Sequence, residues 1–136
     1  MATQEKIKLP LKNKNRPLKS VFMSDKKALG YYGENLALKY YQKLHYKLIT
    51  KNYYSRCGEL DLVLEKNKQI TVVEVKTRST NKFLWAEESI DNKKIEKIRR
   101  TYEVLARQKK LSRFFELEAL IIQITGSRAT IRRYQL

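Results

Sequence analysis

Two acidic residues and a lysine stand at strand spacing in the middle of this chain. Asp61 lies in residues 59–65, where leucines alternate with polar residues, and Glu74 and Lys76 lie in the apolar run 70–76. Side chains two residues apart on a strand share one face, so Glu74 and Lys76 point the same way. Two carboxylates beside a lysine could bind a divalent cation and position a water molecule for hydrolysis.

The register of these two strands decides whether the two acids meet. Asn67 and Lys68 form a turn between the strands, because Asn tolerates a left-handed backbone. If these two residues are the hairpin loop, Asp61 lies directly opposite Glu74, with Cβ atoms about 4.5–5.5 Å apart. Such like charges destabilise a hairpin unless a cation lies between them, and oxygen ligands suit Mg²⁺ or Mn²⁺. A slip of one residue would turn the acids to opposite faces.

A helix ahead of the strands carries a third acid. From Ser24 onward, apolar residues recur at steps of three and four, and Glu34 lies at the edge of that apolar stripe. Gly30 and Gly33 each cost this helix about 1 kcal/mol relative to Ala, which indicates that something approaches its backbone closely. Glu34 is either a solvated flank residue or an acid that points into a cleft between helix and sheet.

The charge of the chain favours a polyanionic partner. Its 136 residues are enough for one domain, and they carry 30 Lys and Arg against 14 Asp and Glu, a net charge of +16. Nucleic acid is favoured over an anionic membrane, because no basic amphipathic helix with aromatic anchors dominates. One Cys and one His exclude a disulfide framework and zinc sites built on several thiolates or histidines. No apolar run is long enough to span a bilayer and no signal-peptide pattern is seen, so we expect a cytoplasmic protein.

The chain divides into an arm and a body. Residues 1–22 are rich in Lys and contain two prolines, which predicts a flexible basic arm that adds phosphate contacts, or else an extension without a role. Residues 23–136 read as a single α/β domain in the order α-β-β-β-α-β-β. The expected elements are a helix from Ser24, strands over 46–54, 59–65 and 70–76, a loop over 77–90, a helix from Asp91 to about Lys110, and strands over 114–125 and 129–134.

The second helix is strongly basic outside its apolar stripe. A solvated helix face is the usual interpretation of such a run, but a large excess of cations near a phosphate site favours contact with a nucleic-acid backbone. The candidate nucleic-acid contacts are Arg78, Lys93, Lys94, Lys97 and Arg100.

Three short motifs, taken in order, resemble the bacterial YraN family. They are Gly-x-x-Gly-Glu at residues 30–34, Gly-Glu-Leu-Asp at 58–61 and Val-Glu-Val-Lys-Thr-Arg at 73–78, and the resemblance covers about residues 28–125. That family is assigned to the restriction-endonuclease-like PD-(D/E)XK superfamily and is similar to archaeal Holliday-junction resolvases. Glu59-Leu60 replaces the Pro that names the motif, a change that the YraN group shares. Leu84 stands where the family often has Gly.

The resemblance implies a restriction-endonuclease-like core, with a mixed central β-sheet flanked by helices, and a metal-dependent endonuclease that hydrolyses DNA, including branched or recombination intermediates. Asp61 and Glu74 match the metal ligands, with Mg²⁺ or Mn²⁺ as the cofactor, and Glu34 matches an acid that binds the metal directly or through water. Lys76 matches the lysine that orients the nucleophile. Lys93 matches the lysine of the family's Asp-x-x-Lys helix start. Junction resolvases work as dimers, so a homodimer is implied as well.

Two other functions stay open on the sequence alone. One is a nucleic-acid-binding module that keeps the fold without hydrolysis, and the other is a structural RNA-associated protein that relies on charge. The acids could also simply solvate an exposed sheet face, with Lys76 pairing Glu74. Carboxylates that face a phosphate without a metal repel it, which favours the nuclease over the binding roles. The resemblance favours DNA over RNA as the partner.

Overall fold

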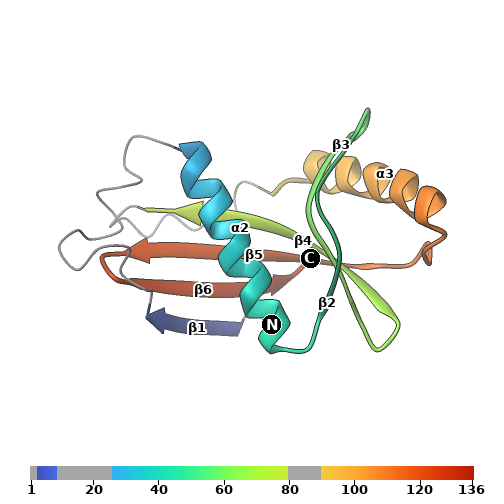
Figure 1. The fold of residues 1–136 in the computed structure, drawn as a ribbon. Coiled ribbons are helices and arrows are strands. Elements are labelled where there is room, and N and C mark those ends of the chain that lie inside the picture. Colours follow the sequence, from blue (N-terminus) through green and yellow to red (C-terminus); the bar gives the residue numbers. More distant parts are fainter. Residues whose placement is uncertain (1–2, 9–25, 80–89) are drawn as a thin grey trace.

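The computed structural model describes residues 3–8, 26–79 and 90–136. These residues form one six-stranded sheet in the order β1-β6-β5-β4-β3-β2, with helix α2 on one face and helix α3 on the other (Figure 1). The elements are β1 (Thr3–Lys8), α2 (Lys26–Lys43), β2 (Lys47–Ser55), β3 (Gly58–Lys66), β4 (Gln69–Arg78), α3 (Asn92–Lys109), β5 (Glu116–Thr125) and β6 (Arg128–Gln135).

The sheet is mixed because one of its connections crosses over. Strands β2, β3 and β4 form an antiparallel meander, whereas β4 and β5 are parallel and are joined through α3. Parallel neighbours need a long connection of this kind, which the helix supplies. Strand β6 then returns antiparallel to β5. The predicted order of elements from the first helix onward is confirmed, and the apolar strand β4 is an interior strand.

The structure differs from the sequence prediction at its N-terminal end. Thr3–Lys8 forms β1, which pairs antiparallel with β6 and makes the sheet edge, where a flexible arm outside the fold was expected. Residues 9–22 of that predicted arm lie outside the described part of the chain, as does most of the predicted loop 77–90. The first two residues of the predicted loop, Thr77 and Arg78, instead belong to β4.

Two apolar layers hold the helices to the sheet. Along β4, Val73 and Val75 belong to the cluster under α2, while Ile70 and Val72 belong to the cluster under α3. This alternation follows from the two-residue period of a strand and explains why β4 reads as a continuous apolar run. Neither described helix is both long and apolar enough to cross a membrane.

Strand β3 departs from the predicted alternation. The sequence places all its leucines on one face, and that prediction is wrong for Leu60. Leu62 and Leu64 pack under α2, but Leu60 packs under α3 together with Val63. A regular strand would put Leu60 and Leu62 on the same side, so the strand changes its facing at the residue between them, Asp61.

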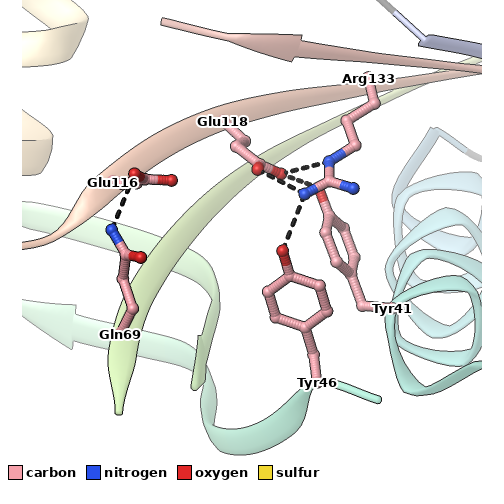
Figure 2. A network of polar contacts seen from close by, with 6 residues as sticks. All are labelled: Tyr41, Tyr46, Gln69, Glu116, Glu118 and Arg133. Atoms are coloured by element: carbon pink, nitrogen blue, oxygen red, sulfur yellow. Dashed lines mark hydrogen bonds and ion pairs between the residues drawn. The ribbon is translucent and has the colours of Figure 1, made fainter. Parts of the chain in front are cut away.

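A buried ion pair between β5 and β6 anchors the C-terminal half of α2 to these two strands. Arg133 of β6 donates two hydrogen bonds to Glu118 of β5, at 2.8 and 2.7 Å, and Tyr41 of α2 donates a third at 2.6 Å (Figure 2). Arg133 also donates to the Tyr46 hydroxyl at 2.8 Å, while Gln69 and Glu116 form a separate hydrogen bond nearby. Glu118 is only 5% exposed, so its charge depends on these partners.

Candidate active site

Strands β3 and β4 separate at the residue that the sequence singles out. The predicted register is confirmed from Lys66 opposite Gln69 to Leu62 opposite Val73, and the next pair in this register is Asp61 and Glu74. The backbone ladder ends before that pair, however. Asp61 instead uses its side chain, whose Oδ2 accepts a hydrogen bond from the Val75 backbone amide at 2.8 Å. The carboxylate therefore replaces a backbone acceptor where the two strands fork.

Burial and neighbouring charge act together on Asp61. Burial is the main cause that raises its pKa from 3.8 to about 7, and the negative charge of Glu74 adds to the rise. The hydrogen bond from Val75 acts in the opposite direction, because it favours the ionised form. Glu34 and Glu59 raise the pKa further. The fork thus gathers negative potential within a chain whose net charge is +16.

Glu74 is held by two lysines from different elements. Its side chain is 5% exposed, and its Oε1 lies 3.6 Å from Lys76 Nζ on the same strand and 3.3 Å from Lys94 Nζ on α3. The predicted shared face of Glu74 and Lys76 is confirmed. Two ammonium groups offset the cost of burying one carboxylate, and they place cations beside the fork.

A close contact between α2 and β4 positions Glu34. A Cβ added to Gly33 would overlap Thr77 Oγ1, so only a glycine lets the helix lie this near the strand. The predicted close approach is therefore confirmed for Gly33, whereas no heavy atom of the described residues lies within 4 Å of the same position at Gly30. Glu34 lines a hollow beside Asp61, between α2 and the hairpin of β2 and β3. Of the two positions left open by the sequence, a solvated flank or a cleft between helix and sheet, it has the second.

The surroundings of Glu34 leave one of its oxygens without a partner. Its Oε2 is buried and has no hydrogen-bond partner among the described residues. Burial raises the pKa of Glu34, and a hydrogen bond with Asn52 opposes that rise. Asn52 has a left-handed backbone (φ 50°) in the middle of β2, which turns its side chain toward the helix acid. Asn52 is not among the residues predicted from the sequence, although an Asn among strand-forming residues is a recognisable signal.

Two hollows flank the hairpin of β2 and β3, which rises away from the rest of the sheet beside α3 (Figure 1). We call the first, of about 220 Å³, the acidic hollow. Its walls include Tyr31, Glu34, Asn52, Tyr54, Glu59 and Asp61. We call the second, of about 360 Å³, the basic hollow. Its walls include Tyr54, Ser55, Gly58, Glu59, Lys94 and Lys97. Tyr54 and Glu59 face each other across the hairpin and line both hollows.

The predicted nucleic-acid contacts fall into two groups. Lys94 and Lys97 line the basic hollow next to the fork. Arg100 lies further along α3 and pairs with Glu96 at 3.2 Å on the exposed side of that helix. Lys93, in the first turn of α3, and Arg78, at the end of β4, are exposed. Asp91 begins α3 as predicted, because its side chain accepts a hydrogen bond from the Lys94 amide at 2.9 Å.

The oxygen donors of the fork suit a hard divalent cation. In residues 3–8, 26–79 and 90–136, no three His, Cys, Asp or Glu side chains form a group that could hold a metal ion by themselves. Mg²⁺, however, is usually bound by one or two carboxylates, with water and substrate phosphate completing its shell. Asp61 and Glu74 supply two carboxylates of this kind, and Glu34 Oε2, which has no hydrogen-bond partner among the described residues, is an oxygen of the same chemistry outside any three-residue group. These groups fit Mg²⁺ or Mn²⁺.

The mixed six-stranded sheet, its two flanking helices and the forked central strands make a restriction-endonuclease-like α/β core. Residues 33–121 match the model of the uncharacterised protein family UPF0102, and the chain belongs to that family.

Individual members of the family are also similar to this chain. A UPF0102 protein of Syntrophomonas wolfei is 48% identical over 67 residues, which cover 49% of this chain and 58% of that protein. A UPF0102 protein of Caldicellulosiruptor bescii is 37% identical over 100 residues, which cover 70% of this chain and 84% of that protein. The match thus spans little more than half the length of the first relative and most of the second.

Proposed function

We propose that this protein is a metal-dependent endonuclease that hydrolyses phosphodiester bonds in DNA. The observation that carries the proposal is the fork of β3 and β4, where Asp61 accepts a hydrogen bond from the backbone amide that follows Glu74 and senses the charge of that residue, while Lys76 and Lys94 lie beside Glu74. A solvated sheet face would not need a carboxylate that is 5% exposed and held by two lysines.

Each residue has a role in this chemistry. In the reaction, a water oxygen attacks phosphorus and the water gives up one proton to the solvent, one bridging P–O bond breaks, and the leaving oxygen takes up a proton from the solvent. Asp61, Glu74 and, directly or through water, Glu34 would hold the Mg²⁺ or Mn²⁺ ion. The bound ion would neutralise phosphate charge and lower the pKa of water. Lys76 would orient the attacking water and stabilise the negative charge that develops on the phosphate.

Cations outside the fork would bind the substrate backbone. Lys94 and Lys97 are the best-placed candidates because they line the basic hollow beside the carboxylates. Lys93, Arg78 and Arg100 would extend the contact along exposed surface. Backbone contacts of this kind position the substrate and carry little sequence information.

Cleavage of labelled DNA tests the proposal. Duplex, single-stranded and four-way-junction DNA are incubated with the wild type in Mg²⁺ and in Mn²⁺, beside Glu74→Gln. Glu103→Gln, an exposed acid on α3, is the matched control. Cutting by the wild type and Glu103→Gln but not by Glu74→Gln supports the nuclease. Absence of metal-dependent cutting by the wild type, or equal cutting by Glu74→Gln, argues against it.

A non-catalytic nucleic-acid-binding protein is the second candidate. The observation in its favour is that both Lys76 and Lys94 pair with Glu74, which leaves that carboxylate compensated without a metal. In this case Mg²⁺ would not raise the melting temperature, whereas a metal site of Asp61 and Glu74 predicts a rise that Glu74→Gln abolishes.

A further inference from the structure

Two tyrosines stand exposed at the edge of the acidic hollow. Tyr31 of α2 is 50% exposed and Tyr54 of β2 is 66% exposed, and both line that hollow together with Glu34 and Asp61. Neither belongs to the two core clusters, unlike Tyr53, which packs under α3 and donates a hydrogen bond to Gln108 at 2.6 Å. We call Tyr31 and Tyr54 the tyrosine rim.

The tyrosine rim lies where a nucleotide could reach both cations and carboxylates. Tyr54 is a wall of the acidic hollow and also of the basic hollow, where Lys94 and Lys97 are found. A base that stacks on the ring of Tyr54 therefore has lysines on one side for its phosphate and the Asp61 fork on the other. Exposed aromatic rings beside cations are the usual means of binding single-stranded nucleic acid.

We propose that the tyrosine rim stacks an unpaired base next to the phosphate that is cut, so that the preferred substrate carries unpaired nucleotides rather than an uninterrupted duplex. This inference rests on the proposed function. Bases inside a duplex are already stacked on both faces, so an aromatic ring cannot reach them without unstacking. An unpaired base has a free face, and stacking on a tyrosine is indifferent to its identity.

Binding without cleavage tests the inference separately from the nuclease. The probes are a fluorescent oligothymidylate and a duplex of equal length, titrated with full-length protein in EDTA. We expect Tyr54→Ala to weaken binding of the single strand by about tenfold, from the loss of one stacked base, and to leave duplex binding unchanged. Tyr54→Phe keeps the ring and should bind as the wild type does. Phe114→Ala is the matched control, since Phe114 is 71% exposed and lies away from both hollows.

The outcomes separate the two proposals. Equal affinity of the wild type and Tyr54→Ala for the single strand overturns the stacking proposal. An equal loss of affinity for the single strand and the duplex overturns it too. If Tyr54→Ala binds weakly but Tyr54→Phe does too, the hydroxyl and not the ring is responsible, and stacking is again overturned. If the wild type binds neither probe, stacking is overturned, while the cleavage assay in Mg²⁺ or Mn²⁺ decides the proposed function separately. Thermal unfolding of each variant shows whether the fold is kept.

Discussion

Two glycines of α2, one turn apart, test how this helix is held against the sheet. An added Cβ at Gly33 would overlap Thr77 Oγ1 and lie 2.8 Å from Thr77 Cβ and 2.9 Å from its Cγ2. At Gly30 the same atom would meet no atom of the described residues within 4 Å. Replacement by Ala is the same chemical change at both positions, but only Gly33→Ala forces α2 away from β4.

The expected difference follows from two opposing effects. Replacing a helical Gly by Ala stabilises a protein by about 0.5–1 kcal/mol, and Gly30→Ala should show that gain in full. Gly33→Ala receives the same gain, but atoms closer than 3.0 Å must separate, and such overpacking costs about 1–3 kcal/mol. Because both changes affect the unfolded chain alike, Gly30→Ala should be more stable than Gly33→Ala by about 1–3 kcal/mol.

Urea unfolding followed by circular dichroism measures this difference. The double variant with Thr77→Ala supplies the control, because it removes two of the three overlapping atoms of Thr77. Thr77→Ala loses no hydrogen bond, since Oγ1 is buried without a partner among the described residues. The double variant should recover most of the stability that Gly33→Ala loses. Equal unfolding midpoints for the two glycine variants, or no recovery in the double variant, would refute this account of Gly33.

Three further predictions concern charged groups. Burial and Glu74 raise the pKa of Asp61 from 3.8 to about 7, so the free energy of unfolding of the metal-free protein should fall as pH rises between those values. Asp61→Asn should remove that fall. Parallel pH profiles of the wild type and the variant in urea unfolding would contradict this prediction. Arg133→Leu should lower the free energy of unfolding by about 3–5 kcal/mol, because Glu118 stays buried without its ion pair, and a loss of only about 0.5 kcal/mol would show that Glu118 does not need it. Lys97→Gln should reduce the slope of log affinity for DNA against log salt concentration by about 0.7–0.9. Lys109→Gln, at the end of α3, should leave the slope unchanged. Equal slopes for the wild type and Lys97→Gln would show that Lys97 does not contact DNA.

Local patterns predicted the elements that carry the candidate site. The alternation around Asp61 and the turn at Asn67 predicted a hairpin, and its register is confirmed up to Leu62 opposite Val73. The capping role of Asp91 was also readable, because it depends only on the hydrogen bond to a backbone amide three residues later. These features involve neighbours along the chain or across one tight turn.

Other features could not be read from neighbouring residues. The pairing of β1 with β6 joins segments near opposite ends of the sequence, and the parallel pairing of β4 with β5 depends on how the connecting helix α3 packs on the face of the sheet. The side-chain partners of Glu118 also come from two distant elements, Tyr41 from α2 and Arg133 from β6. Contacts of such long sequence separation leave little trace in local periodicity.

The sequence by itself determined the acids of the site, their strand and helix positions and the basic charge of the chain, because residue type and spacing fix these properties. Only the tertiary structure decided how the acids meet. It shows that Asp61 bonds to the backbone of β4 at a fork, that Lys94 reaches Glu74 from α3, and that Gly33 lets α2 lie close to β4. The physical reason is that burial and charge, which raise the pKa of Asp61, arise from groups that folding brings together from distant parts of the chain.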